Sequence, residues 1–133
     1  MPPKLDVAFS YDFNPTVTLR VTSPRTGASV TVRAIIDTGA DRSAFDSFIL
    51  QDIDPDAEMT GATSFTGAGG AAVDVAFYEV ELALLDRDDM RVTLPIAFAF
   101  GLRRSVGHLL GLDVLEHFDF ALAHHDRLGY LGR

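Results

Sequence analysis

The feature that most constrains how this chain can fold is the octet from Ala34 to Asp41. It reads Ala-Ile-Ile-Asp-Thr-Gly-Ala-Asp, so two β-branched residues lead directly into an acid and a turn of small residues follows. An ionised aspartate at the end of a buried strand must be solvated or paired, because an isolated buried charge is costly. Thr38 supplies a hydroxyl and Gly39 an unhindered backbone for a tight turn. The octet therefore predicts a strand and turn that direct the Asp37 carboxylate into a cleft.

Short turns of this kind also have other uses. An apolar-Asp-x-Gly sequence can simply end a structural strand, and it occurs in phosphate sites of the sugar-kinase type. Taken alone, the octet leaves the catalytic, structural and phosphate-binding interpretations open.

Alternating apolar residues elsewhere predict an all-β chain. Residues 15–22 and 29–37 alternate as two strands around a turn at 23–27, which predicts a hairpin. Further strands are expected at 73–85, 90–100, 118–123 and 128–131, with turns at 86–89 and 124–127, a short helix or turn within 41–54, and a short helix at 113–117. Pro95 suggests an edge position or a bulge in its strand. Strands at such short spacing are typical of a closed all-β domain.

Length and charge limit the classes of protein to consider. The chain has 133 residues, enough for one domain (1–133, with a core over about 15–131) but not for two catalytic lobes. It carries 11 basic and 19 acidic residues, for a net charge of −8. Nucleic-acid binding would need a basic stripe, and the sequence has none, so we expect no nucleic-acid partner.

The sequence also bears on location. No apolar run approaches the roughly 18 residues of a membrane span, and the N-terminus lacks the apolar core of a signal peptide. We therefore expect no membrane partner, and a cytoplasmic location is favoured. The chain has no cysteine, which excludes disulfides and thiolate metal sites.

Three motifs occur in a fixed order along the chain. The turn Asp37-Thr38-Gly39-Ala40 comes first, the glycine-rich segment 67–70 follows about 30 residues later, and Leu109-Leu110-Gly111 follows about 40 residues after that. Together they resemble the retropepsin-like aspartic proteases, the single-lobed family that includes the retroviral proteases and many bacterial relatives. The resemblance covers residues 15 to 131. It implies a closed β domain with one short helix that functions as a two-fold dimer.

The resemblance also assigns roles to these motifs. It implies that Asp37 is the catalytic acid and that the third motif packs against the catalytic loop and opens the helix. The second motif is expected to be the flap over the substrate; it consists of Gly67, Ala68, Gly69 and Gly70. Glycine suits a flap because it lets a backbone approach a peptide closely and move as a lid. By itself the segment could equally be a plain turn or a phosphate nest, although no Walker lysine follows it.

Hydrolysis by two carboxylates explains the dimer. One ionised acid takes a proton from water and one protonated acid polarises the carbonyl, and acids about 3 Å apart share one proton. The chain has a single turn of this type, since Asp119 lacks the Thr-Gly sequence and lies among strand residues. The second acid must therefore be Asp37 of a two-fold partner. The resemblance implies the same homodimer, acting on a peptide or protein substrate without metal or organic cofactor.

The residues around Asp37 receive supporting roles from the resemblance. Thr38 would hold the two turns together, and the substrate would lie along Gly39, Ala40 and Asp41. Many retroviral relatives carry an arginine directly after the third motif, paired with the acid that corresponds to Asp41, but this chain has Leu112 there. Arg42 or another basic residue could substitute for it.

Two further observations leave alternatives open. The interface strands of the family are not recognisable in residues 1–14 or 128–133. A catalytically silent dimerisation or peptide-binding module on the same fold therefore remains an alternative, as does a phosphate-handling enzyme. His108, His117, His124 and His125 lack metal-ligand spacing, and Ser43 lacks the context of a serine nucleophile.

Overall fold

The computed structural model describes residue 5 and residues 7–66, 72–84, 87–102 and 107–133. Its ten strands are β1 (Val7–Ser10), β2 (Thr16–Thr22), β3 (Ser29–Ile36), β4 (Ala44–Asp46), β5 (Gly61–Thr66), β6 (Ala72–Leu84), β7 (Arg87–Ala99), β8 (His108–Leu110), β9 (Asp119–Ala123) and β10 (Leu128–Gly132). Two short α-helices, α1 (Phe48–Ile53) and α2 (Leu112–Leu115), and the 3-10 turn η2 (His124–Asp126) complete the described elements.

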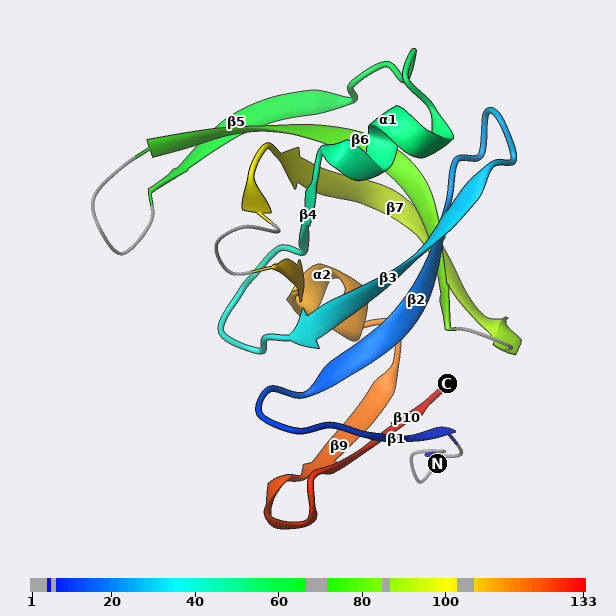
Figure 1. Ribbon diagram of the computed structural model, residues 1–133, viewed down its shortest axis with the longest axis vertical. Coiled ribbons are helices and arrows are strands. Elements are labelled where there is room, and N and C mark those ends of the chain that lie inside the picture. The colour runs from blue at the N-terminus through cyan, green and yellow to red at the C-terminus, as the bar shows by residue number, and fades with distance from the viewer. Residues whose placement is uncertain (1–4, 6, 67–71, 85–86, 103–106) are drawn as a thin grey trace.

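Most strands form a closed barrel, as the alternation predicted. The larger sheet has the order β2-β3-β8-β4-β7-β6-β5, and an additional β2–β6 pairing closes six of its strands into a barrel. Strand β5 pairs only with β6 and extends the sheet away from the barrel (Figure 1). The fold class expected from the sequence is confirmed.

The barrel interior is filled by alternate residues of its strands. On β2, Val17, Leu19 and Val21 are buried, whereas the residues between them are half-buried, as a strand with one inward face requires. At the centre, the rings of Phe45 and Phe98 meet edge to face with centroids 6.0 Å apart. The barrel closes around one main hydrophobic core.

The long hairpin of β6 and β7 carries the irregularity that Pro95 suggested, but at a different place. The register shifts between Ala83 and Leu84, near the far end of the hairpin. Pro95 lies opposite Glu79 in regular pairing, two residues before β7 begins to pair with β4 at Ala97. The proline therefore occupies an edge stretch of β7, one of the two positions that the sequence suggested for it.

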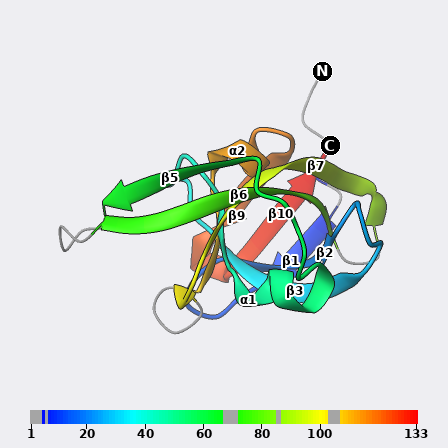
Figure 2. The same cartoon turned by 90° about the horizontal axis from the view of Figure 1, so that it is seen from above.

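The two chain ends form a separate antiparallel sheet in the order β1-β10-β9. Strand β1 was not expected from the sequence, because four residues are too few for a clear alternation. Its Phe9 ring packs directly against Gly129, where any side chain would collide with the ring. Figure 1 shows this sheet at one end of the barrel, and Figure 2 shows β9, β10 and β1 side by side from above.

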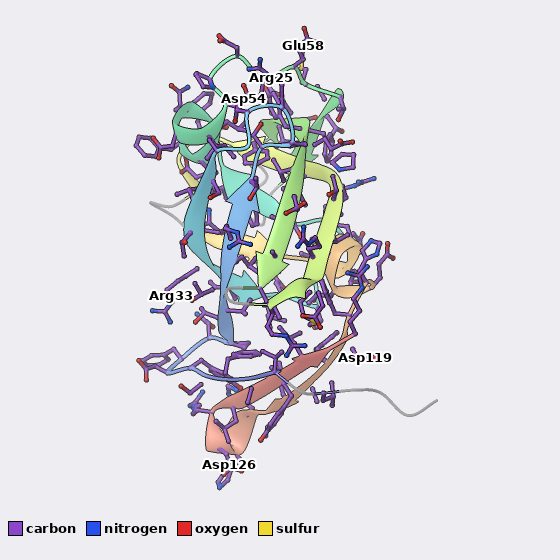
Figure 3. The ribbon with its side chains drawn as sticks, turned by 90° about the vertical axis from the view of Figure 1, so that its right-hand side faces the viewer. Arg25, Arg33, Asp54, Glu58, Asp119 and Asp126 are labelled. Atoms are coloured by element: carbon purple, nitrogen blue, oxygen red, sulfur yellow. The ribbon has the colours of Figure 1, made fainter. Side chains whose placement is uncertain are left out.

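The region 41–54, expected as a short helix or turn, contains both a strand and a helix, β4 and α1. The C-terminal end of α1 is tied to the β2–β3 turn by a polar cluster (Figure 3). The buried Asp54 carboxylate accepts hydrogen bonds from the Ser23 hydroxyl at 3.0 Å and from the Arg25 guanidinium, whose Nε lies 3.0 Å away. The Thr26 hydroxyl donates to the Ile53 carbonyl at 2.7 Å. These bonds hold the helix against the hairpin.

Across the described ranges, none of the helices has the length and apolar character needed to span a membrane.

Candidate active site

Asp37 follows the last residue of β3, as the octet predicted, and its turn is closed by its own side chain. The Gly39 N–H donates to Asp37 Oδ1 at 3.0 Å, and the Ala40 N–H donates to the Asp37 carbonyl at 3.2 Å. Such a side-chain bond two residues ahead is the Asx-turn that aspartate forms readily. No described residue donates to Oδ2 of the same carboxylate. One oxygen is therefore fixed and the other remains available to a reactant.

Strand β8 holds this turn from the side. It pairs in parallel with β3, with Ile36 opposite Leu110, and the Asp37 N–H donates to the Leu110 carbonyl at 2.9 Å. Beyond β8, the Leu112 N–H donates to the Ala40 carbonyl at 2.8 Å. A Cβ on Gly111 would lie only 2.6 Å from the same carbonyl oxygen, so only glycine fits there. The third sequence motif packs against the Asp37 turn.

A second acid supports the turn from behind, and sequence reasoning missed it. Asp113 Oδ1 accepts from the Ser43 N–H at 2.8 Å, from the Ser43 hydroxyl at 2.7 Å and from the Val114 N–H at 2.8 Å. The Ser43 oxygen in turn accepts the Gly111 N–H at 2.9 Å. The available signal was Asp113 itself, an acid in the first turn of the expected helix, where it can accept backbone N–H bonds.

Comparison with known proteins then gives the family. The family model for the retroviral aspartyl protease matches residues 11–123. The chain belongs to this family. A search of curated proteins finds no significant match.

Solved structures support the family fold. The EIAV protease, in a complex with the inhibitor HBY-793, is 19% identical with a TM-score of 0.60, over 82% of this chain and 93% of that one. A retropepsin-like aspartic protease from Rickettsia conorii is 16% identical with a TM-score of 0.62, over 93% of this chain and 96% of that one. The retropepsin-like resemblance inferred from the three motifs is confirmed.

The flap expected of a retropepsin-like chain lies outside the described residues. It comprises Gly67, Ala68, Gly69 and Gly70. The structure describes the two strands that flank it, β5 and β6, with Thr66 opposite Ala72. In Figure 1 this hairpin and the turn after β3 extend to the same side of the barrel. The assignment of the four residues as a flap stays a prediction.

Leu112 departs from the retroviral pattern, and no described cation replaces the missing arginine. Asp41 is exposed, and within the described ranges its carboxylate has no ion-pair partner. The Arg42 guanidinium does not turn back to it but lies over the Phe77 ring, 5.1 Å from the centroid. The Asp113 N–H donates to the Asp41 carbonyl at 3.1 Å. Backbone bonds therefore connect this part of the turn to α2 where many relatives use an arginine.

The remaining polar residues lie apart from the Asp37 turn. Asp119 is exposed at the start of β9, in the sheet formed by the chain ends (Figure 3). His108 Nδ1 accepts the Asp46 N–H at 3.2 Å, and its ring meets Phe45 edge to face. The described residues contain no group of three His, Cys, Asp or Glu side chains placed to hold a metal.

A cavity of about 370 Å³ is lined by residues of α1 and of the strands β5, β6 and β7. Leu50, Asp54, Tyr78 and Phe100 are among its lining residues, and Asp37 is not.

Proposed function

We propose that this protein is an aspartic endopeptidase, active as a homodimer in which each protomer contributes Asp37. The observation that carries this proposal is the Asp37 turn, in which the Gly39 N–H holds one carboxylate oxygen at 3.0 Å and no described group occupies the other. The family to which the chain belongs and the fold of its solved relatives support the same activity.

The chemistry follows from two carboxylates that share one proton. Acids about 3 Å apart cannot both ionise, so the pair holds a single negative charge. The ionised Asp37 takes a proton from a water, which attacks the peptide carbonyl, while the protonated Asp37 donates a hydrogen bond to the carbonyl oxygen. A tetrahedral intermediate forms. The leaving nitrogen then takes a proton as the C–N bond breaks, which completes hydrolysis without a cofactor.

The neighbouring residues have the following proposed roles. Thr38 is exposed beside Asp37, where it can contact the partner turn across the two-fold axis. The peptide or protein substrate lies along Gly39, Ala40 and Asp41. The flap closes over it from the opposite side through Gly67, Ala68, Gly69 and Gly70.

A catalytically silent module on the same fold is the alternative that Leu112 favours. The absence of an arginine at residue 112 would impair catalysis most if the position of the Asp37 turn depended on that arginine. Backbone bonds from Leu112 and Asp113 to the turn, of 2.8 and 3.1 Å, instead hold its position. We therefore favour catalysis. The phosphate-handling alternative would need a second, nucleotide-binding lobe, whereas the described strands build one barrel and a terminal sheet.

A direct test compares the wild-type protein with Asp37→Asn on a library of internally quenched peptides. Cleavage by the wild type that Asp37→Asn abolishes, with an unchanged circular dichroism spectrum and an unchanged dimer mass in sedimentation, supports the proposal. Binding of peptides without cleavage by the wild type would favour the silent module. Cleavage at equal rates by both proteins would contradict the role of Asp37.

A further inference from the structure

An apolar row crosses the barrel wall on the face that points away from the main core. The pairing registers align one residue from each of six strands, β3, β8, β4, β7, β6 and β5 in that order; they are Ile35, Leu109, Ala44, Ala97, Phe77 and Gly61. Directly paired residues project to the same face of a sheet. Their chain neighbours Ile36, Phe45 and Phe98 point the other way and belong to the main core. The row is therefore a separate apolar surface.

This surface starts at the catalytic turn. Side chains alternate along a strand, so Asp37 continues the side of Ile35, two residues earlier, and opposes Ile36. At the far end, Phe77 packs with Val75, Ala97 and Ala99 in a small second cluster. The row thus runs from the Asp37 turn to the hairpin that carries the expected flap, the space in which a substrate would lie.

The side chain of Arg42 lies over this row. The Arg42 guanidinium lies 5.1 Å from the centroid of the Phe77 ring, within the range of a cation–π contact. Arg42 is exposed, and among the described residues no carboxylate lies within ion-pair distance of it. The aromatic ring restricts the orientation of the side chain while its N–H donors remain available. A positioned cation next to an apolar wall is suited to bind a carboxylate.

We propose that Arg42 and the apolar row form a substrate pocket that selects an acidic side chain. The inference rests on the proposed peptidase function and deepens it by naming a specificity determinant. The guanidinium can bind an aspartate or glutamate carboxylate through two parallel hydrogen bonds, and the half-buried Phe77 contacts the methylene groups beside it. Because each protomer carries one such pocket, a homodimer selects acidic residues on both sides of the scissile bond.

The test uses matched peptide substrates that differ only by Glu or Gln, placed in turn at the second, third and fourth positions on either side of a cleaved bond. For the wild type, kcat/KM is expected to favour Glu over Gln by about tenfold at one of these positions. In Arg42→Gln the ratio is expected to fall to about one, and in Arg42→Glu the preference is expected to pass to Lys.

A control variant removes the same charge elsewhere. Arg91 lies on β7, six residues from Ala97. Arg91→Gln is expected to retain the wild-type ratio of kcat/KM between Glu and Gln peptides. The pocket would be overturned if the wild type showed equal kcat/KM for Glu and Gln peptides at all positions. It would also be overturned if Arg42→Gln kept the wild-type preference for Glu. Neither result would contradict the peptidase activity.

A peptide-binding measurement distinguishes an incorrect pocket assignment from an incorrect assignment of peptidase activity. The same peptides, labelled with a fluorophore, are titrated with the Asp37→Asn protein and with Asp37→Asn/Arg42→Gln. The pocket is supported if Asp37→Asn binds the Glu peptides more tightly than the Gln peptides and Asp37→Asn/Arg42→Gln does not. This result would support the pocket even if the wild type cleaves no peptide. Equal binding of Glu and Gln peptides to Asp37→Asn would overturn it.

Discussion

The Asp113 carboxylate receives two hydrogen bonds from one residue, the backbone N–H and the hydroxyl of Ser43, at 2.8 and 2.7 Å. Ser43 is fully buried and lies between the Asp37 turn and β4 along the chain. Its oxygen also accepts the Gly111 N–H, so one hydroxyl joins the two segments that flank the Asp37 turn. This pair therefore connects the segments on either side of the Asp37 turn.

The first prediction concerns the Ser43 hydroxyl. Ser43→Ala leaves Gly111 N–H without its acceptor and removes one donor from Asp113, so we expect a loss of about 1–3 kcal/mol in the free energy of unfolding. Urea denaturation measures it. Ser47→Ala is the matched control, because the Ser47 side chain makes no cap hydrogen bond at α1, and it is expected to change stability by less than about 0.5 kcal/mol. Equal effects of both substitutions would contradict the role given to Ser43.

A second prediction concerns the contact between Gly111 and the Asp37 turn. In Gly111→Ala the new methyl group would lie 2.6 Å from the Ala40 carbonyl oxygen and from the Arg42 carbonyl carbon, both backbone atoms. Overpacking of this kind costs about 1–3 kcal/mol or more, and peptidase activity is expected to fall further because the Asp37 turn must shift. The melting temperature and kcat/KM are measured together.

Gly61→Ala provides the comparison for Gly111→Ala. A Cβ at residue 61 would meet the Phe77 ring at 3.8 Å, an ordinary contact. This variant is expected to retain a wild-type melting temperature. If Gly111→Ala were as stable and as active as Gly61→Ala, the close packing at Gly111 would contribute neither to stability nor to activity, and the prediction would be wrong.

The third prediction is a pH dependence of stability from Asp54. The hydrogen bond from the Arg25 guanidinium, together with that from Ser23, lowers the pKa of the Asp54 carboxyl below its ordinary value, despite its burial. A lowered folded-state pKa means that the unfolded chain binds the proton more tightly. The stabilisation is therefore complete above the unfolded value of about 3.9 and is lost as pH falls through the lower folded value.

Asp54→Asn is expected to be less stable than the wild type at pH 7, with a difference that narrows below about pH 4. Urea denaturation across pH 2 to 7 measures this difference. The control is Asp52→Asn, an exposed carboxylate on the same helix. A constant difference between Asp54→Asn and the wild type over the whole pH range would contradict the linkage.

The sequence predicted the parts of the fold that local patterns determine. The hairpin of β2 and β3 was predicted because its residues alternate over the full length of both strands, and the Asp37 turn because acid, hydroxyl and glycine follow a β-branched pair. Helix α2 was expected at 113–117 and spans Leu112–Leu115, so it begins one residue earlier and ends two residues earlier than expected.

The missed features depend on contacts between distant parts of the chain. Ser43 and Asp113 are 70 residues apart, and neither has a local signal for its partner. The parallel pairing of β3 with β8, and the row that it aligns with Phe77, depend on registers that no local pattern specifies. Strand β1 has four residues and is defined by its pairing with β10, which lies at the other end of the chain.

In the proposed peptidase, one active site needs Asp37 from two protomers. Wild-type and Asp37→Asn protomers are mixed at constant total concentration, and exchange into mixed dimers is verified by native mass spectrometry with a tagged protomer. If the site is shared and a dimer with one Asp37 is inactive, kcat/KM per total protein follows the square of the wild-type fraction, so an equal mixture retains about a quarter of the activity. A linear decrease, with about half of the activity in an equal mixture of exchanged dimers, would show that each protomer carries a complete site and would contradict the account.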